Sequence, residues 1–273
     1  MAEIKQLTPN YPPMLLQYLE YKEKYSDCLI LFQVGDFYEL FFDDAKVVAK
    51  TLNLTLTSRD KSNPNPVPMC GVPISVIDAY AERLVEAGFS VALISQVSEG
   101  EAVTKGGVPR KLERIITPGV RILSANQSDT TNSILASIYG DSLNNLAVAF
   151  CDIQWGKVFV REGFNLENLQ SEIARINPSE ILFTKEIAGK TLDRRVSWVR
   201  ELERATNSNI KWRGESYLKD NRFDNLEGLL SLSPQGRKAT RLLLGYIDET
   251  TVDISASITE VSLKDYDEVL SID

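Results

Sequence analysis

Hydrophobic residues in the first part of the chain form helical faces and short apolar runs in turn. Residues 11–26 place Leu15, Leu16, Tyr18 and Leu19 at helical spacing behind two prolines that suit a helix start. The apolar run at 27–35 ends at a glycine and predicts a buried strand. The same reasoning predicts helices at 42–53 and 75–88, strands at 54–59, 89–97 and 110–119, and a proline-rich loop at 61–68.

The pattern changes after residue 122. Residues 123–132 are polar and without strong periodicity, which predicts a linker. Residues 226–250 have a helical pattern that is interrupted at Pro234-Gln235-Gly236. Between these two segments we expect strands at 134–139, 145–153, 156–163 and 179–185, and a helix at 166–177. Strands and helices mix in both halves, so the fold class is α/β, with two mixed domains at 1–122 and 133–250.

The composition limits the class of protein and the kinds of catalytic or metal site that the chain can form. The 273 residues are 43% hydrophobic and 25% charged, which is ordinary for a globular protein. No apolar run is long enough for a membrane span, and no signal peptide opens the chain, so we expect a cytoplasmic protein. The three cysteines are expected to be reduced core residues. There is no histidine, which excludes Ser-His and Cys-His catalysis and histidine-ligated metal sites.

Charge is unevenly distributed. The net charge is −8, but residues 105–121 hold five basic residues and one acidic residue, a local charge of +4. This stretch is either a solvated surface or a patch that contacts a nucleic-acid backbone. The candidate contacts within it are Lys105, Arg110, Lys111 and Arg114.

Two kinds of enzymatic site deserve comparison with the sequence: a nucleotide-binding P-loop and a metal-dependent nuclease centre. Neither GxxxxGK[ST] nor GxGxxG is present, so the sequence does not predict nucleotide hydrolysis by a P-loop. Asp152 ends a predicted strand that is followed by a turn and a second strand, which resembles the start of RNase H-type nucleases. A two-metal site needs several converging carboxylates. The downstream candidates, Glu172, Glu180, Asp193 and Glu203, form no recognisable pattern. The alternatives are therefore a metal-dependent nuclease centred on Asp152 and a module that binds another protein.

The segment Phe37-Tyr38-Glu39 poses a separate question. If it is extended, Phe37 and Glu39 share one face and Tyr38 points to the other. If the shared face is core, Glu39 is costly to bury; if it is surface, Phe37 is an exposed apolar wedge.

Residues 8–60, 67–97 and 109–119 resemble, in order and spacing, the amino terminus of the MutS family of mismatch-repair proteins. Residues 146–160 and 169–183 resemble the connector domain of the same family more loosely. The resemblance implies a mismatch-recognition domain, an RNase H-like connector, and the start of a core domain at 251–273.

The resemblance also assigns roles to residues. Phe37 would stack beside a mispaired or unpaired base in the minor groove, and Glu39 would hydrogen-bond an edge of that base. Tyr38 would anchor the strand in the core. Arg59 matches a basic position of the DNA-facing region, and Met69 matches a residue near the kinked bases. The Ile74-Ser75 pair departs from the Tyr-His that the family often has there.

The family pattern continues beyond Asp273, so we expect this chain to be a piece of a longer protein. The full-length protein is implied to be a bacterial, homodimeric ATPase that uses ATP and magnesium, associates with the nucleoid and meets MutL through the connector. The chain itself is expected to be a monomer that binds mismatched double-stranded DNA, with no catalytic residue, cofactor or metal.

Overall fold

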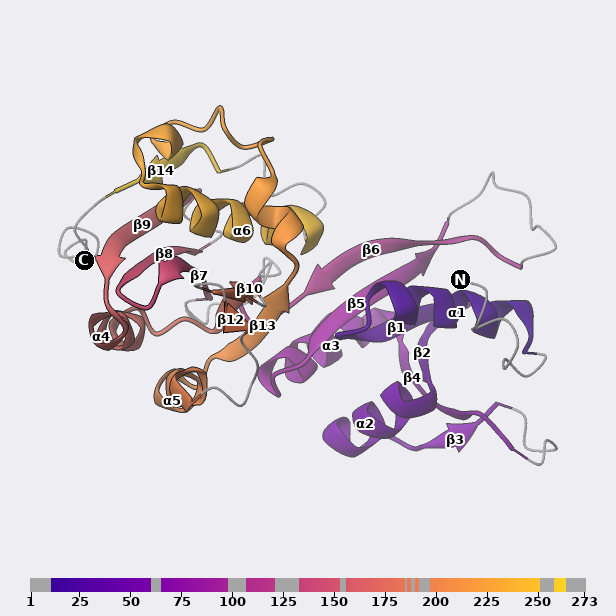
Figure 1. The fold of residues 1–273 in the computed structure, drawn as a ribbon. Helices are drawn as coiled ribbons and strands as arrows, with labels where there is room; N and C mark the ends of the chain where they lie inside the picture. The colour runs from indigo at the N-terminus through magenta and orange to yellow at the C-terminus, as the bar shows by residue number, and fades with distance from the viewer. Residues whose placement is uncertain are drawn as a thin grey trace. The chain divides into compact units, whose positions relative to one another are not determined.

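The computed structural model describes residues 11–59, 65–97, 107–120, 133–152, 156–184, 186–187, 190–191, 197–250 and 258–263. The chain divides into two compact units, Met1–Thr117 and Pro118–Asp273 (Figure 1). The predicted linker at 123–132 lies outside the described residues, as does Lys105. Both units are mixtures of helices and strands, which confirms the predicted fold class.

The first unit is built on a six-stranded sheet in the order β3-β4-β2-β1-β5-β6. The neighbours β1 and β5 run parallel, and every other pair is antiparallel. The strands are β1 Cys28–Val34, β2 Phe37–Phe41, β3 Thr57–Ser58, β4 Pro68–Pro73, β5 Ser90–Gln96 and β6 Arg110–Ile116. The helices are α1 Pro13–Lys24, α2 Phe42–Leu52 and α3 Ile77–Glu86, with the short turn η2 Ile74–Val76 before α3.

Helices cover both faces of this sheet. Leu15 and Tyr18 of α1 pack on one face against Ile30, Phe32 and Phe41. The apolar residues of α2 and α3 pack on the other face against those of β1, β2, β4 and β5. The side chains of β1, β2, β4 and β5 therefore alternate between an α1 face and an α2–α3 face.

A buried carboxylate fastens α1 to this sheet. Asp44, on α2, accepts hydrogen bonds from the Tyr18 hydroxyl (2.9 Å) and the Ile30 backbone N–H (3.0 Å). The Lys22 ammonium lies 2.9 Å from the same carboxylate. One side chain thus joins α1, α2 and β1.

The second unit also has a six-stranded sheet, in the order β13-β10-β7-β8-β9-β14. The first three strands in sequence form an antiparallel meander, and β10 and β13 then add in parallel beside β7. The strands are β7 Ile134–Ser142, β8 Asn145–Asp152, β9 Lys157–Phe164, β10 Glu180–Thr184, β13 Asn209–Arg213 and β14 Glu260–Ser262, with a separate pair β11 Glu186–Ile187 and β12 Lys190–Thr191. This arrangement agrees with the RNase H-like fold that the resemblance implied.

Helices α4 Leu166–Ile176 and α5 Ser197–Thr206 pack on one face of this sheet, and α6 Pro234–Thr250 packs on the other. None of the helices in the described part of the chain is both long and apolar enough to cross a membrane.

The prediction for residues 226–250 was wrong in one respect. Pro234-Gln235-Gly236 does not interrupt a helix but begins α6, and only the short turn η5 Leu229–Ser231 precedes it. Proline favours the first helical position, where its missing N–H has no helical partner in any case. Within the segment expected to begin a core domain, Glu260–Ser262 pairs in parallel with β9. The role of the rest of that segment stays a prediction.

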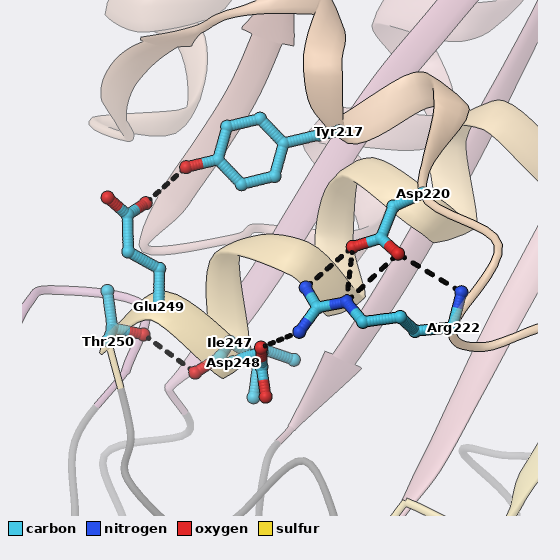
Figure 2. A network of polar contacts seen from close by, with 7 residues as sticks. All are labelled: Tyr217, Asp220, Arg222, Ile247, Asp248, Glu249 and Thr250. Atoms are coloured by element: carbon cyan, nitrogen blue, oxygen red, sulfur yellow. Dashed lines mark hydrogen bonds and ion pairs between the residues drawn. The ribbon is translucent and has the colours of Figure 1, made fainter.

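A polar network holds the segment before α6 against the end of that helix (Figure 2). Tyr217, in the turn η4 Glu215–Lys219, donates to Glu249. The Arg222 guanidinium contacts Asp220 (2.6 Å) and Asp248 (2.7 Å). Hydrogen bonds from Arg222 lower the pKa of the Asp220 carboxyl. Arg222 bridges two carboxylates from different segments, so the network is a structural brace of the second unit.

Candidate nucleic-acid interface

Phe37 and Glu39 share the α1 face of the sheet, and Tyr38 points to the α2–α3 face. Phe37 is 46% exposed, whereas Tyr38 is 4% exposed. Phe37 directly follows the two-residue turn between β1 and β2, where Gly35 adopts a φ of 59°. Such tight hairpin turns favour glycine at a positive φ. Phe37 is therefore an exposed apolar side chain at the end of a tight hairpin.

Tyr38 fixes this hairpin from behind. Its hydroxyl lies 2.6 Å from the Ser95 hydroxyl and donates to a Glu113 carboxylate oxygen at 3.0 Å. Burial, above all, raises the pKa of the Tyr38 phenol. Strands β2, β5 and β6 are therefore joined beneath Phe37, as the predicted anchoring role requires.

Gly71 leaves room beside the exposed pair. It is the cross-strand partner of Glu39 on β4. A Cβ at this position would lie 3.7 Å from the Glu39 Cγ and 3.8 Å from the Phe37 Cδ1. Both side chains therefore lie close to the bare backbone of β4.

Two arginines flank Glu39. The Arg59 guanidinium, just after β3, donates to the Glu39 carboxylate at 2.8 Å. Arg110, on β6, stacks over the Phe32 ring at 4.4 Å and donates to the Gln33 carbonyl at 2.7 Å. Phe32 is the cross-strand neighbour of Glu39 on β1. One exposed aromatic ring, one carboxylate and two guanidinium groups thus gather on one face.

Burial raises the pKa of the Glu39 carboxyl, although Arg59 and Arg110 act in the opposite direction. The charged form is therefore less favourable here than in an unfolded chain. Ionisation of Glu39 therefore lowers the stability of the folded state. This loss of stability is absent below the ordinary glutamate pKa, appears as the pH rises through the folded-state pKa, and is fully present at neutral pH.

Replacing Glu39 with glutamine is therefore expected to raise the unfolding temperature of the first unit at pH 7, by about 1–3 °C. The gain should shrink as the pH falls toward 4, where Glu39 itself becomes neutral. Calorimetry of Glu39→Gln across this pH range tests the expectation, with the exposed Glu86→Gln as control. A lower unfolding temperature at pH 7 would mean that the ion pair outweighs burial.

The other predicted residues are divided between the faces. Met69 lies on the α1 face opposite Phe41 and is partly buried against the core. Lys111 is exposed, and its pairing with Ser95 places it on the α2–α3 face. Arg114 contacts Asp78 of α3 on that same face. The structure therefore brings Phe37, Glu39, Arg59, Met69 and Arg110 together on one face and separates Lys111 and Arg114 from them.

Two exposed apolar residues near Phe37 were not assigned a role from the sequence. Ile74 is 37% exposed and Val76 is 41% exposed, both in η2. The Ile74 N–H donates to the Asp36 carbonyl at 3.0 Å, which holds η2 beside the hairpin turn. The sequence feature that could have drawn attention to this position is the Ile74-Ser75 pair, which stands where the resembled family often has Tyr-His.

The candidate carboxylates that the structure describes in the second unit do not converge as the nuclease hypothesis requires. Asp152 and Glu180 lie on opposite faces of the sheet, because Glu180 and Cys151 both align with Leu135. Glu180 accepts hydrogen bonds from Tyr246 and the Gly119 N–H, and Glu172 pairs with Arg161 and Arg175. Among the described residues, no group of three or more candidate ligands is placed to hold a metal ion. Asp193 lies outside the described residues.

Comparison with known proteins also divides the chain into two parts. The family model of MutS domain I matches residues 12–124, and that of MutS domain II matches residues 132–258. The DNA mismatch repair protein MutS of Staphylococcus saprophyticus is 41% identical over 192 residues, which cover 70% of this chain and 21% of that protein. The protein of the same name from Desulforamulus reducens is 42% identical over 178 residues, which cover 64% and 20%. The chain thus spans about a fifth of the length of these curated relatives.

Proposed function

The chain belongs to the MutS family of DNA mismatch repair proteins, and we propose that its first unit recognises mispaired or unpaired bases through Phe37 and Glu39. One observation carries the proposal: Phe37 is exposed at the end of a hairpin, on the same face as Glu39. A phenylalanine in this position has no core to fill and is free to enter a base stack.

The wedge senses a defect through the cost of unstacking. Inserting an apolar side chain between base steps costs a few kcal/mol, and the cost is least where a base is mispaired or unpaired. Defective duplex also kinks more easily than intact duplex. Phe37 therefore distinguishes the two without reading sequence.

Glu39 adds discrimination against intact duplex. A charged carboxylate near phosphates and base acceptors is repelled unless a base donor meets it. Arg59 and Arg110 outnumber it on this face and favour binding of the backbone. Met69 would lie near the kinked bases. Lys105 is proposed as an additional phosphate contact. Lys111 and Arg114 would reach a phosphate only from the α2–α3 face, and Arg114 only if it exchanges Asp78 for that phosphate.

The role of the second unit is proposed from the family. It relays between the DNA site and an ATPase in the full-length, homodimeric protein, which uses ATP and magnesium, and it meets MutL. For this chain alone we propose binding rather than catalysis.

Fluorescence anisotropy of the chain with two labelled duplexes tests the proposal. The duplexes differ in one base, so that one holds a mispair and the other is fully paired. Measurements begin at low salt, because electrostatic binding weakens steeply as salt rises. We expect tighter binding to the mispaired duplex at every salt concentration. Equal affinities throughout would contradict a sensing role for this chain.

A further inference from the structure

Arg59 reaches Glu39 across a neighbouring strand. Arg59 follows the edge strand β3, and Glu39 lies on β2, with β4 between them. The residue of β4 opposite Glu39 is Gly71, which has no side chain to separate the ion pair. The two side chains meet at 2.8 Å although they lie 20 residues apart in sequence.

The exposures of the two partners differ. The Glu39 side chain is 17% exposed and the Arg59 side chain is 41% exposed. The carboxylate is therefore the buried partner, and it depends on the pair more than the arginine does.

We propose that Arg59 is a positioning residue for Glu39: it holds the carboxylate over β4 and keeps it charged in the DNA-free protein, and this charge sets the discrimination against intact duplex. The inference rests on the proposed function of Phe37 and Glu39. It gives Arg59 a role distinct from a backbone contact, because the arginine acts through the glutamate.

The groups that face Glu39 support this role. Among the described residues, the positions beside Glu39 on the neighbouring strands carry no titratable side chain: Phe32 and Val34 on β1, and Met69, Gly71 and Pro73 on β4. From α1, the Tyr21 ring packs on Phe32 and its hydroxyl donates to the Arg110 carbonyl. The charges that act on the Glu39 carboxyl are those of Arg59 and Arg110. Arg110 acts on Glu39 through its charge, and its guanidinium donates hydrogen bonds to the Gln33 carbonyl and to the Gln17 side chain. Arg59 alone of the two contacts the carboxylate directly.

The first experiment uses the DNA-free chain. Nuclear magnetic resonance of carbon-13-labelled glutamate carboxyls follows the titration of Glu39, identified by the signal lost in Glu39→Gln. We expect Arg59→Gln to raise the titration midpoint by about one pH unit, because a nearby opposite charge favours the ionised form. Arg59→Lys should retain most of the wild-type midpoint. Lys46→Gln, which removes the same charge from α2, should not move it. An unchanged midpoint in Arg59→Gln would overturn the inference without bearing on Phe37.

The second experiment measures the affinity ratio between mispaired and intact duplex from pH 4.5 to 8. We expect the ratio to fall as Glu39 becomes protonated, and Arg59→Gln to move this fall to higher pH by the shift found without DNA. Glu39→Gln should remove the pH-dependent step. If Arg59→Gln instead weakens both duplexes equally and leaves the step in place, Arg59 is only a backbone contact and the inference fails. If the wild-type chain shows no preference at any pH, the proposed function fails, and with it the consequence drawn for Arg59.

Discussion

Replacing Phe37 with alanine is expected to lower the affinity of the chain for mispaired duplex by about 5- to 150-fold. The magnitude follows from stacking of an aromatic side chain on a base, worth about 1–3 kcal/mol on truncation to alanine. Affinity for intact duplex should change by less than about twofold, since the wedge has no low-cost site there. Competition between labelled mispaired duplex and unlabelled competitors measures both values.

The exposure of Phe37 makes this result interpretable. Because the side chain is about half exposed and Tyr38 carries the buried contacts of the hairpin, truncation should leave the fold intact. Val47→Ala, at an exposed position of α2, serves as the control for losing a surface apolar side chain. Equal losses for both duplexes in Phe37→Ala would contradict the wedge and indicate a general binding surface.

Replacing Asp44 with alanine is expected to destabilise the first unit by about 3 kcal/mol. The change leaves the Tyr18 hydroxyl, the Ile30 N–H and the Lys22 ammonium without their shared acceptor. Breaking a buried pair by removing one partner costs about 3–5 kcal/mol, because the remaining charge is uncompensated. We expect a value at the lower end of this range because Lys22 is partly exposed and water can hydrate its ammonium group.

Urea unfolding tests this expectation and separates the units. All three tryptophans, Trp155, Trp198 and Trp212, lie in the second unit. The unfolding transition followed by tryptophan emission should therefore be unchanged in Asp44→Ala. Circular dichroism should show that the first unit unfolds at a lower urea concentration than in the wild-type chain. Asp43→Ala removes the adjacent, exposed carboxylate and should leave both transitions in place. An unchanged first transition in Asp44→Ala would show that the three contacts do not fasten α1.

Much of the fold follows from local patterns. The apolar runs at 27–35 and 89–97 correspond to β1 and β5, and the amphipathic segments at 42–53 and 75–88 contain α2 and α3. Alternation within a strand was enough to place Phe37 and Glu39 on one face. These predictions succeeded because each depends only on side chains close together in sequence.

Features that depend on pairing between distant segments were not predictable in this way. Strand β4 was missed because it begins and ends with proline, which disfavours strands in general. The Arg59–Glu39 pair depends on the order β3-β4-β2. In β6, an irregularity opposite Leu93 and Ile94 changes the alternation, so Arg114 lies on the face of Lys111 and not on that of Arg110. A count of charges along the sequence does not show on which face of the sheet each charged side chain lies.

The central claim is that Phe37 meets the defective base, and site-specific crosslinking tests it most directly. A photoreactive phenylalanine analogue replaces Phe37, and the bound duplexes carry one mispair at different positions along otherwise identical sequences. We predict that the crosslinked nucleotide lies at the mispair and moves with it from duplex to duplex. Crosslinks that stay at fixed positions or spread evenly along the DNA would contradict the account.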